Sequence, residues 1–227
     1  TWTEVLAIAP ELTSKDSSFN ISKSTIALGS FDNIANAKDI YWMLVLQAGN
    51  PVIKRDDEVK NQEEVYKSIF TENLNFTLNP AYAATNFFTQ FSNPTKTVYS
   101  WNRSLPNSQN AFVAGDLAFY IGKASELDTI KRLNPNLNFD VALVPQSQSS
   151  TRKVTYGAMS TLLIPRDARN LKGATATVGL LTSKPAQTIF AKEFGVAPVR
   201  KDSLSVSDAA NPYEAVFNKS AVMAQGI

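Results

Sequence analysis

Short apolar runs typical of β-strands alternate along this 227-residue chain with longer segments of helical spacing. The apolar runs predict strands at residues 25–28, 117–121, 139–144 and 159–164. Apolar residues repeated every three or four positions predict helices at 2–13, 34–48, 81–91, 106–114, 126–133, 170–181, 185–194 and 212–225. Helices that alternate with strands and outnumber them indicate an α/β protein.

Local signals mark where several of these helices begin and end. Thr1 and Glu4 have the spacing of a capping box, and Asn79-Pro80 places a cap and a proline at the start of a helix. Asp32-Asn33, Ser125 and Ser183 are the expected caps of three others. Gly49, Gly115 and Gly195 each follow the last periodic residue, where a left-handed backbone conformation often ends a helix. The helix at 34–48 is apolar on nearly all sides from Ile40 onward, so we expect it at the centre of the core.

Two missing residue types exclude most familiar catalytic sites. The chain contains no histidine and no cysteine. It therefore cannot build a Ser-His-Asp triad, a thiol nucleophile, a cysteine-ligated cluster or an ordinary zinc site. No glycine-rich phosphate loop or calcium-binding loop is present either. We expect no cofactor and no metal.

The charge balance also limits the possible partners. The net charge is +2, and 19% of the residues are charged. This gives no strongly basic field for a nucleic acid backbone or an anionic membrane. The longest apolar run, residues 40–46, is far shorter than the roughly 18–20 residues that cross a bilayer.

Carboxylate catalysis stays open on composition. Residues 56–58 and 63–64 are acidic clusters, but they lie in the most hydrophilic part of the chain, where a solvated surface is the commoner explanation. A glycosidase needs two carboxyl groups that face one another across a cleft, and adjacency in sequence does not supply that geometry.

One segment combines aromatic side chains with hydrogen-bonding ones. Residues 99–104 read Tyr-Ser-Trp-Asn-Arg-Ser, a mixture that suits a sugar ring. The alternative is that Trp101 packs under the following helix. Ser125 has a similar ambiguity, because it could present free amides to a ligand oxygen or act as an ordinary helix cap.

Six motifs occur in an order that covers nearly the whole chain. They are TWTEVL at 1–6, ALGSFDNI at 27–34, LVLQAG at 44–49, FVAGDLAFYIG at 112–122, NFDVALVPQ at 138–146 and GVAPVRKD at 195–202. Together they resemble the motifs of family 1 extracellular solute-binding proteins of ABC importers. The resemblance implies a maltose-binding-like fold of the periplasmic-binding-protein type II class, in which two α/β lobes joined by a hinge hold the ligand between them.

The resemblance also implies a division of the chain. Residues 1–146 would form the second, C-terminal lobe, a helix-rich lobe with a short mixed β-sheet. Residues 147–153 would be a hinge connector, 154–194 a returning segment of the first lobe, and 195–227 the passage back. The initial portion of the first lobe has no counterpart, so we expect a truncated fragment. The returning segment would then expose a strand edge and an apolar face, and we expect it to repack or to pair with another copy of the fragment.

In similar proteins the ligand is contacted from three loops. Carried over to this chain, the contacts are Asp32, Asn33 and Asn36 before the long helix, Lys123, Ser125 and Glu126 after the 117–121 strand, and Tyr156 at the start of the returning strand. Such sugar binders often place a tryptophan in the loop after that strand. This chain has none there, and Trp101 is the candidate to replace it.

The resemblance predicts a non-enzymatic substrate-binding component of an ABC importer. It would capture a small solute, most consistently a carbohydrate, outside the cytoplasm, and deliver it to a membrane permease. The full-length protein would be lipid-anchored, and the fragment alone would bind weakly. Two alternatives stay open: a carbohydrate-active enzyme that uses two carboxylates, and a surface-interaction module with no small ligand.

Overall fold

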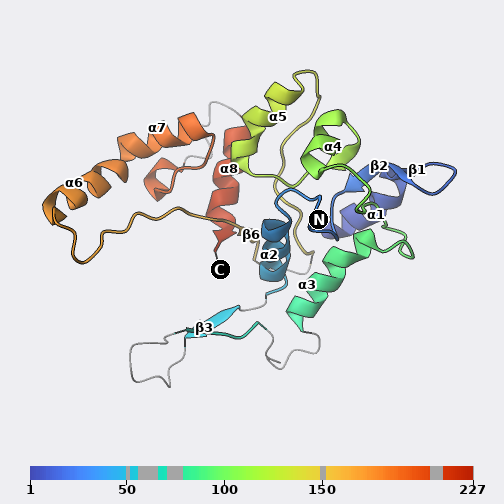
Figure 1. Ribbon diagram of the computed structural model, residues 1–227, viewed down its shortest axis with the longest axis horizontal. Coiled ribbons are helices and arrows are strands. Elements are labelled where there is room, and N and C mark those ends of the chain that lie inside the picture. Colours follow the sequence, from blue (N-terminus) through green and yellow to red (C-terminus); the bar gives the residue numbers. More distant parts are fainter. Residues whose placement is uncertain (50–51, 56–65, 71–78, 149–151, 205–211, 227) are drawn as a thin grey trace. The chain divides into compact units, whose positions relative to one another are not determined.

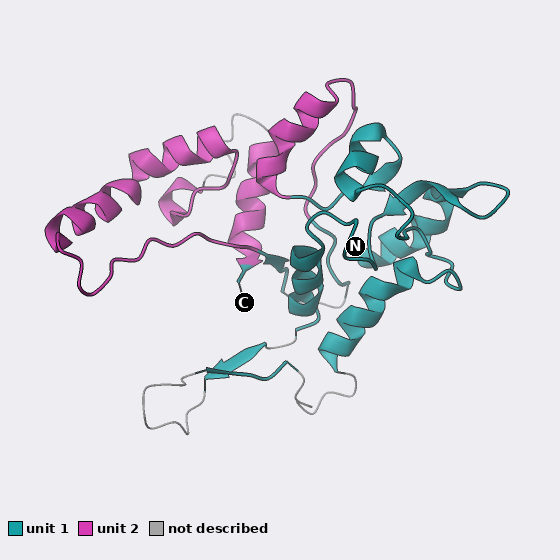
Figure 2. Ribbon diagram, viewed as in Figure 1, with its two compact units in different colours: residues 1–122, 144–156, 225–227 teal, residues 123–143, 157–224 magenta. Residues whose placement is uncertain are grey.

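The structure is a computed structural model that describes residues 1–49, 52–55, 66–70, 79–148, 152–204 and 212–226. The chain forms two compact units (Figures 1 and 2). Unit 1 contains residues 1–122, 144–156 and 225–227, and unit 2 contains residues 123–143 and 157–224. The chain therefore leaves or re-enters unit 1 after residues 122, 143, 156 and 224. These borders differ from the lobe borders expected at 146, 153 and 194, and the lobe assignment stays a prediction.

A three-stranded mixed sheet lies in unit 1. Strand β2 (Ile21–Ile26) is central, with β1 (Ser14–Lys15) antiparallel on one side and β5 (Leu117–Phe119) parallel on the other. Parallel neighbours need a long crossover between them, and the helices between β2 and β5 in the sequence provide it. The sequence therefore predicted a short mixed sheet correctly.

Four helices of unit 1 contribute to one apolar core. They are α1 (Trp2–Leu12), α2 (Ala37–Gln47), α3 (Pro80–Thr89) and α4 (Ser108–Ala114). The 3₁₀ turn η1 (Gln90–Ser92) extends α3 and buries Phe91. Ile40, Met43 and Val45 of α2 are fully or almost fully buried, which confirms that this helix is central. Burying each such side chain stabilises the fold by about 1.5–3 kcal/mol.

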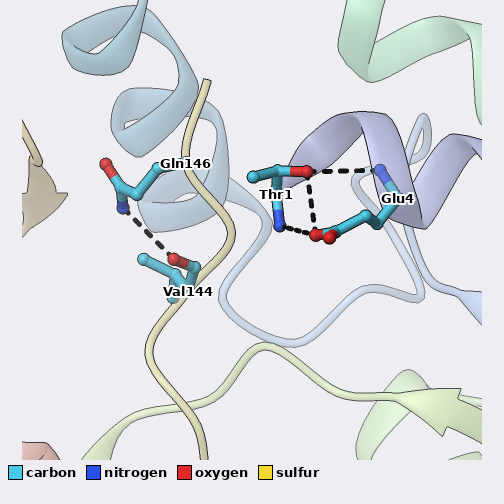
Figure 3. A network of polar contacts seen from close by, with 4 residues as sticks. All are labelled: Thr1, Glu4, Val144 and Gln146. Atoms are coloured by element: carbon cyan, nitrogen blue, oxygen red, sulfur yellow. Dashed lines mark hydrogen bonds and ion pairs between the residues drawn. The ribbon is translucent and has the colours of Figure 1, made fainter. Parts of the chain in front are cut away.

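The helix boundary signals are largely confirmed. The capping box of α1 is present, with the Thr1 hydroxyl accepting from the Glu4 amide and donating to the Glu4 carboxylate (Figure 3). The Asn79 side chain accepts from the amides of α3, and Gly115 ends α4 with a φ of 83°. Helix α2 is different: its N-cap is Asn36, without a side-chain cap, so the expectation that Asp32-Asn33 caps it is wrong.

Two short two-stranded sheets complete the strands of the described residues. Strand β3 (Ile53–Arg55) pairs with β4 (Tyr66–Ser68) in antiparallel register, and all six residues are exposed. Strand β6 (Thr155–Tyr156) pairs with β7 (Ala224–Gln225). The acidic clusters at 56–58 and 63–64 lie outside the described residues.

Unit 2 is helical in its described part. Its elements are η2 (Ala124–Glu126), α5 (Leu127–Leu133), α6 (Leu171–Leu181), α7 (Lys184–Phe194), η3 (Lys201–Ser203) and α8 (Pro212–Met223). The Ser183 side chain caps α7, and Gly195 ends it with a φ of 61°, as the sequence predicts. Arg200 donates two hydrogen bonds to the Asp202 carboxylate, at 2.9 and 2.8 Å, and these bonds lower the pKa of the Asp202 carboxyl.

Helices α6 and α7 bury no residue completely. Large apolar side chains on and before them are exposed, among them Met159, Leu163, Leu180 and Phe194. The strands expected at 139–144 and 159–164 are absent, and both segments are irregular. A strand is stable only when a neighbour pairs with its backbone, and no described segment pairs with either of these.

Residues 144–148 and 152–156 return to unit 1 and are called the crossing segments. Two glutamine side chains hold them in place. The Gln47 amide donates to the carbonyls of Pro145 and Val154, both at 3.0 Å, and its oxygen accepts from the Trp2 indole at 2.7 Å. The Gln146 side chain pairs with the Val154 amide and carbonyl at 2.9 and 3.0 Å, and it also donates to the Val144 carbonyl (Figure 3). These side chains replace the ladder of hydrogen bonds that a sheet would provide.

Replacing Gln47 by methionine tests this role, because methionine keeps the side-chain length and removes the amide. The Trp2 indole and the Pro145 carbonyl lose their partner, and the Val154 carbonyl loses one of two, so we expect Gln47→Met to lower the free energy of unfolding by about 2–4 kcal/mol in urea denaturation. The exposed Gln148→Ala is the control, with a change below about 0.5 kcal/mol. Equal denaturation midpoints for the two variants would contradict the assigned role.

Candidate ligand-binding site

The loop between β2 and α2 is anchored by one amide side chain. Asn33 Nδ2 donates to the carbonyls of Asn102 and Leu105 at 2.8 and 3.0 Å. Asn33 Oδ1 accepts from the Trp101 indole at 3.0 Å, and the Asn33 carbonyl accepts from the Ser108 amide. Both ends of this amide are therefore engaged inside the protein, and Asn33 shapes the loop.

Trp101 is fully buried in the core of unit 1. Its indole nitrogen points to Asn33, and its ring offers no exposed face on which a sugar could stack. Of the two alternatives that the sequence left open, the structure has the core side chain. Trp101 contributes to the site by anchoring the loop that carries Asn33, through the hydrogen bond from its indole.

The flanking residues of the same loop are more accessible. Asp32 is exposed, and one carboxylate oxygen lies 3.6 Å from Arg103 Nε, which is also exposed. An exposed pair at this distance contributes little to stability, so both side chains can turn to a ligand. Asn36 is half-buried, has a φ of 60°, and donates to the Tyr120 hydroxyl at 3.4 Å.

The predicted contacts of unit 2 form a local turn. The Glu126 carboxylate accepts from the backbone amide of Lys123 at 3.0 Å, and Ser125 is exposed inside η2. Ser125 therefore does not cap α5, which corrects that expectation. The carboxylate takes one of the amides that the sequence left for a ligand oxygen.

The remaining predicted residue, Tyr156, lies in β6 of unit 1. Its half-buried side chain packs against the unit 1 core. The structure therefore brings Asp32, Asn33, Asn36 and Trp101 together around one loop and its support. Lys123, Ser125 and Glu126 form a separate group in unit 2.

A hollow of about 620 Å³ opens beside the same loop, within unit 1. It is lined by Gly29, Ser30, Phe31, Tyr41, Thr85, Phe88, Thr89, Ser92, Asn102 and Arg103. Asn102 and Arg103 belong to the aromatic and polar run that the sequence singled out. Residues 29–31 belong to a family-like motif but were not predicted as contacts. The lining residues of α2 and α3 were not predicted as ligand contacts, because the helical spacing of these segments is already explained by packing in the core.

The described part of the chain lacks two features, a metal-binding cluster and a membrane-spanning helix. Its acidic side chains form no group of three or more that could hold a metal ion. Among the helices described, none is long and apolar enough to cross a membrane.

A family model described as bacterial extracellular solute-binding protein matches residues 1–218. This chain belongs to that family. The family match agrees with the order of motifs along the sequence, and it covers both units of this solute-binding protein apart from the last residues. A comparison with curated proteins gives no significant match.

Two solved structures share the fold of this solute-binding protein. One is a cyclo/maltodextrin-binding protein complexed with maltotetraose, with 18% identity, a TM-score of 0.65, and coverage of 100% of this chain and 53% of that one. The other is a putative oligosaccharide periplasmic-binding protein from Synechococcus sp. MITs9220, with 19% identity, a TM-score of 0.59, and coverage of 98% and 52%. The chain thus has a periplasmic-binding-protein fold and spans about half the length of these structures.

Asn33 and Asp32 are adjacent but have different surroundings, which gives a direct test of the loop. Asn33→Ala leaves the Trp101 indole and the Leu105 carbonyl without a partner and the Asn102 carbonyl with the Leu105 amide alone, so we expect a loss of about 1.5–3 kcal/mol in the free energy of unfolding. Asp32→Asn removes only an exposed charge, and we expect a change below about 0.5 kcal/mol. Urea denaturation of both variants measures this. Equal stabilities would show that the Asn33 amide does not hold the loop.

Proposed function

We propose that this chain is part of the substrate-binding component of an ABC importer and captures a carbohydrate. The observation that carries the proposal is the family match over residues 1–218. The choice of a carbohydrate is supported by the two solved structures, since one is bound to maltotetraose and the other is described as an oligosaccharide binder. Proteins of this family are generally not enzymes, and this chain acts by binding alone.

The proposed contacts come from residues that are accessible in their own units. Asp32 and Asn36 present a carboxylate and an amide in unit 1, where Tyr156 adds a phenol. Lys123, Ser125 and Glu126 present an ammonium, a hydroxyl and a carboxylate in unit 2. Such groups donate to and accept from sugar hydroxyls. Asn33 and Trp101 hold the loop that carries Asp32 and Asn36.

Ligand binding would shift the protein between an open and a closed population, and a membrane permease would recognise the closed state. The protein would act outside the cytoplasm, in keeping with the family description, and a lipid anchor on the full-length protein would keep it near the permease. A ligand can shift such a balance only by its different affinity for the two states.

Titration with maltotetraose tests the proposed activity. A ligand that binds only the folded state raises the midpoint of thermal unfolding, and we expect a rise at millimolar sugar that is smaller in Lys123→Gln and Glu126→Gln than in the exposed control Arg132→Gln. Chromogenic glycosides should stay intact. Their hydrolysis would favour a carbohydrate-active enzyme, and an unchanged midpoint with all sugars would favour an interaction module.

We also propose that the 227-residue chain self-associates through the exposed apolar residues of unit 2. Leu163 and Phe194 are 87% and 64% exposed, and an apolar surface of this kind is costly in water. Static light scattering should give a mass above 24.8 kDa that falls when Leu163 and Phe194 are both replaced by serine. A strictly monomeric parent chain would contradict the proposal.

A further inference from the structure

The hollow in unit 1 has the size and the walls of a ligand site. Its volume of about 620 Å³ lies within the range of small-molecule pockets. The walls come from residues 29–31 after β2, from α2 and α3, from residue 92 of η1, and from residues 102–103. All of them belong to unit 1, so the hollow does not depend on unit 2.

An exposed aromatic ring forms one wall. Phe31 is 56% exposed, although Phe88, which its ring contacts, is only 3% exposed. Its ring meets the buried Phe88 edge-to-face at 6.0 Å, and Phe88 in turn meets Tyr41 edge-to-face at 6.0 Å. Phe88 therefore fixes two rings of the lining. A fixed aromatic ring with an open face suits the apolar side of a sugar ring.

One polar group in the lining lacks a partner. Ser30 is 8% exposed, and its buried hydroxyl makes no hydrogen bond. An unpaired buried hydroxyl costs free energy that a ligand hydroxyl would recover. A change of rotamer, a rotation of about 120° about the Cα–Cβ bond, reorients this hydroxyl, because a serine side chain has three staggered positions.

The other hydroxyls of the lining are arranged as acceptors. Thr85 donates to the Ala81 carbonyl at 2.8 Å, Thr89 to the Thr85 carbonyl at 2.9 Å, and Ser92 to the Thr89 carbonyl at 3.0 Å. Thr89 and Ser92 use their protons in these bonds and keep oxygen lone pairs for a donor, whereas the Thr85 oxygen already pairs with the Tyr41 hydroxyl at 2.9 Å. Arg103 supplies donors at the rim, and its charge is opposed by Asp32.

Gly29 allows the loop after β2 to lie close to η1. Its φ of 90° is one that other residues rarely adopt, and a Cβ there would lie 2.6 Å from the Ser92 hydroxyl and 2.9 Å from the Ser92 backbone nitrogen. Only glycine permits this approach of the loop to η1. The close approach places Ser30 and Phe31 beside the hydroxyls of α3 and η1.

We propose that this hollow binds an uncharged saccharide ring, as a site separate from the loop contacts of Asn36, Lys123 and Glu126. Phe31 stacks on the ring, Ser30 and Arg103 donate to its oxygens, and the hydroxyls of α3 and η1 accept from its hydroxyls. The ligand is uncharged because, among the described residues of the lining, Arg103 alone is charged and it already faces Asp32.

The test is a titration of the ¹⁵N-labelled chain with maltotetraose, and with tetragalacturonate as an acidic probe. Maltotetraose should shift the amide signals of residues 29–31 and 102–103. Ser30→Ala and Phe31→Ala should each weaken binding about three- to tenfold. Ser203→Ala is the matched control, because Ser203 also has a buried hydroxyl without a partner but lies in unit 2, and its affinity should not change.

Stability separates a binding role from a structural one. The Ser30 hydroxyl makes no hydrogen bond, so Ser30→Ala should weaken binding without lowering the midpoint of thermal unfolding. The exposed Tyr66→Ala controls for the loss of an aromatic side chain elsewhere in unit 1.

Four results would overturn the proposal. They are no shift at residues 29–31 with millimolar maltotetraose, unchanged affinity in both Ser30→Ala and Phe31→Ala, a loss of affinity in Tyr66→Ala as large as in Phe31→Ala, and tighter binding of tetragalacturonate than of maltotetraose. Weaker binding in Lys123→Gln, with no effect of Ser30→Ala and Phe31→Ala, would keep the proposed function and refute this site.

Discussion

The fold of unit 1 depends on the side-chain amide of Gln47. It joins the start of α1, the end of α2 and both crossing segments, through one accepted and two donated hydrogen bonds. Buried backbone carbonyls need partners, and residues 144–148 contain no strand that could provide them. Gln47 and Gln146 supply the missing partners from side chains. Two glutamines thus give the crossing segments the hydrogen bonds that a sheet edge would otherwise give.

The same principle organises the loop at the candidate site. Asn33 satisfies two carbonyls of the segment after Trp101 and receives the Trp101 indole proton, so its amide has no remaining use for a ligand. The loop is thereby fixed relative to the core, while Asp32 and Phe31 beside it stay exposed. Asn33, which holds the loop, and Asp32 and Phe31, which are proposed to contact a ligand, are thus close in sequence but differ in exposure.

Local signals predicted much of the fold, and long-range pairing accounts for what they missed. The capping box at Thr1, the Asn79-Pro80 start and the Gly115 end were found because each depends on a few consecutive residues. The strands expected at 139–144 and 159–164 failed because a strand depends on a partner that an apolar run does not specify. The sequence alone could not decide the roles of Trp101 and Asn33, because these roles depend on a hydrogen bond between residues 68 positions apart. The hollow was missed for the same reason, because it combines residues from Gly29 to Arg103.

The position of Ser30 argues that the hollow is more than a packing defect. Other buried serines of unit 1 are paired: Ser24 donates to the Ser100 carbonyl at 2.7 Å, Ser100 to the Ile26 carbonyl at 3.0 Å, and Ser108 accepts from the Ala35 amide at 2.9 Å. Burying a hydroxyl without a partner costs about 1–3 kcal/mol, and an alanine at the same position would avoid this cost. The unpaired serine lies in the wall of a hollow, next to an exposed aromatic ring and a glycine that brings the wall together. Ser203 of unit 2 also has an unpaired buried hydroxyl, so it is the position of Ser30 in the wall of the hollow, where a ligand hydroxyl would remove the cost, that supports a binding role.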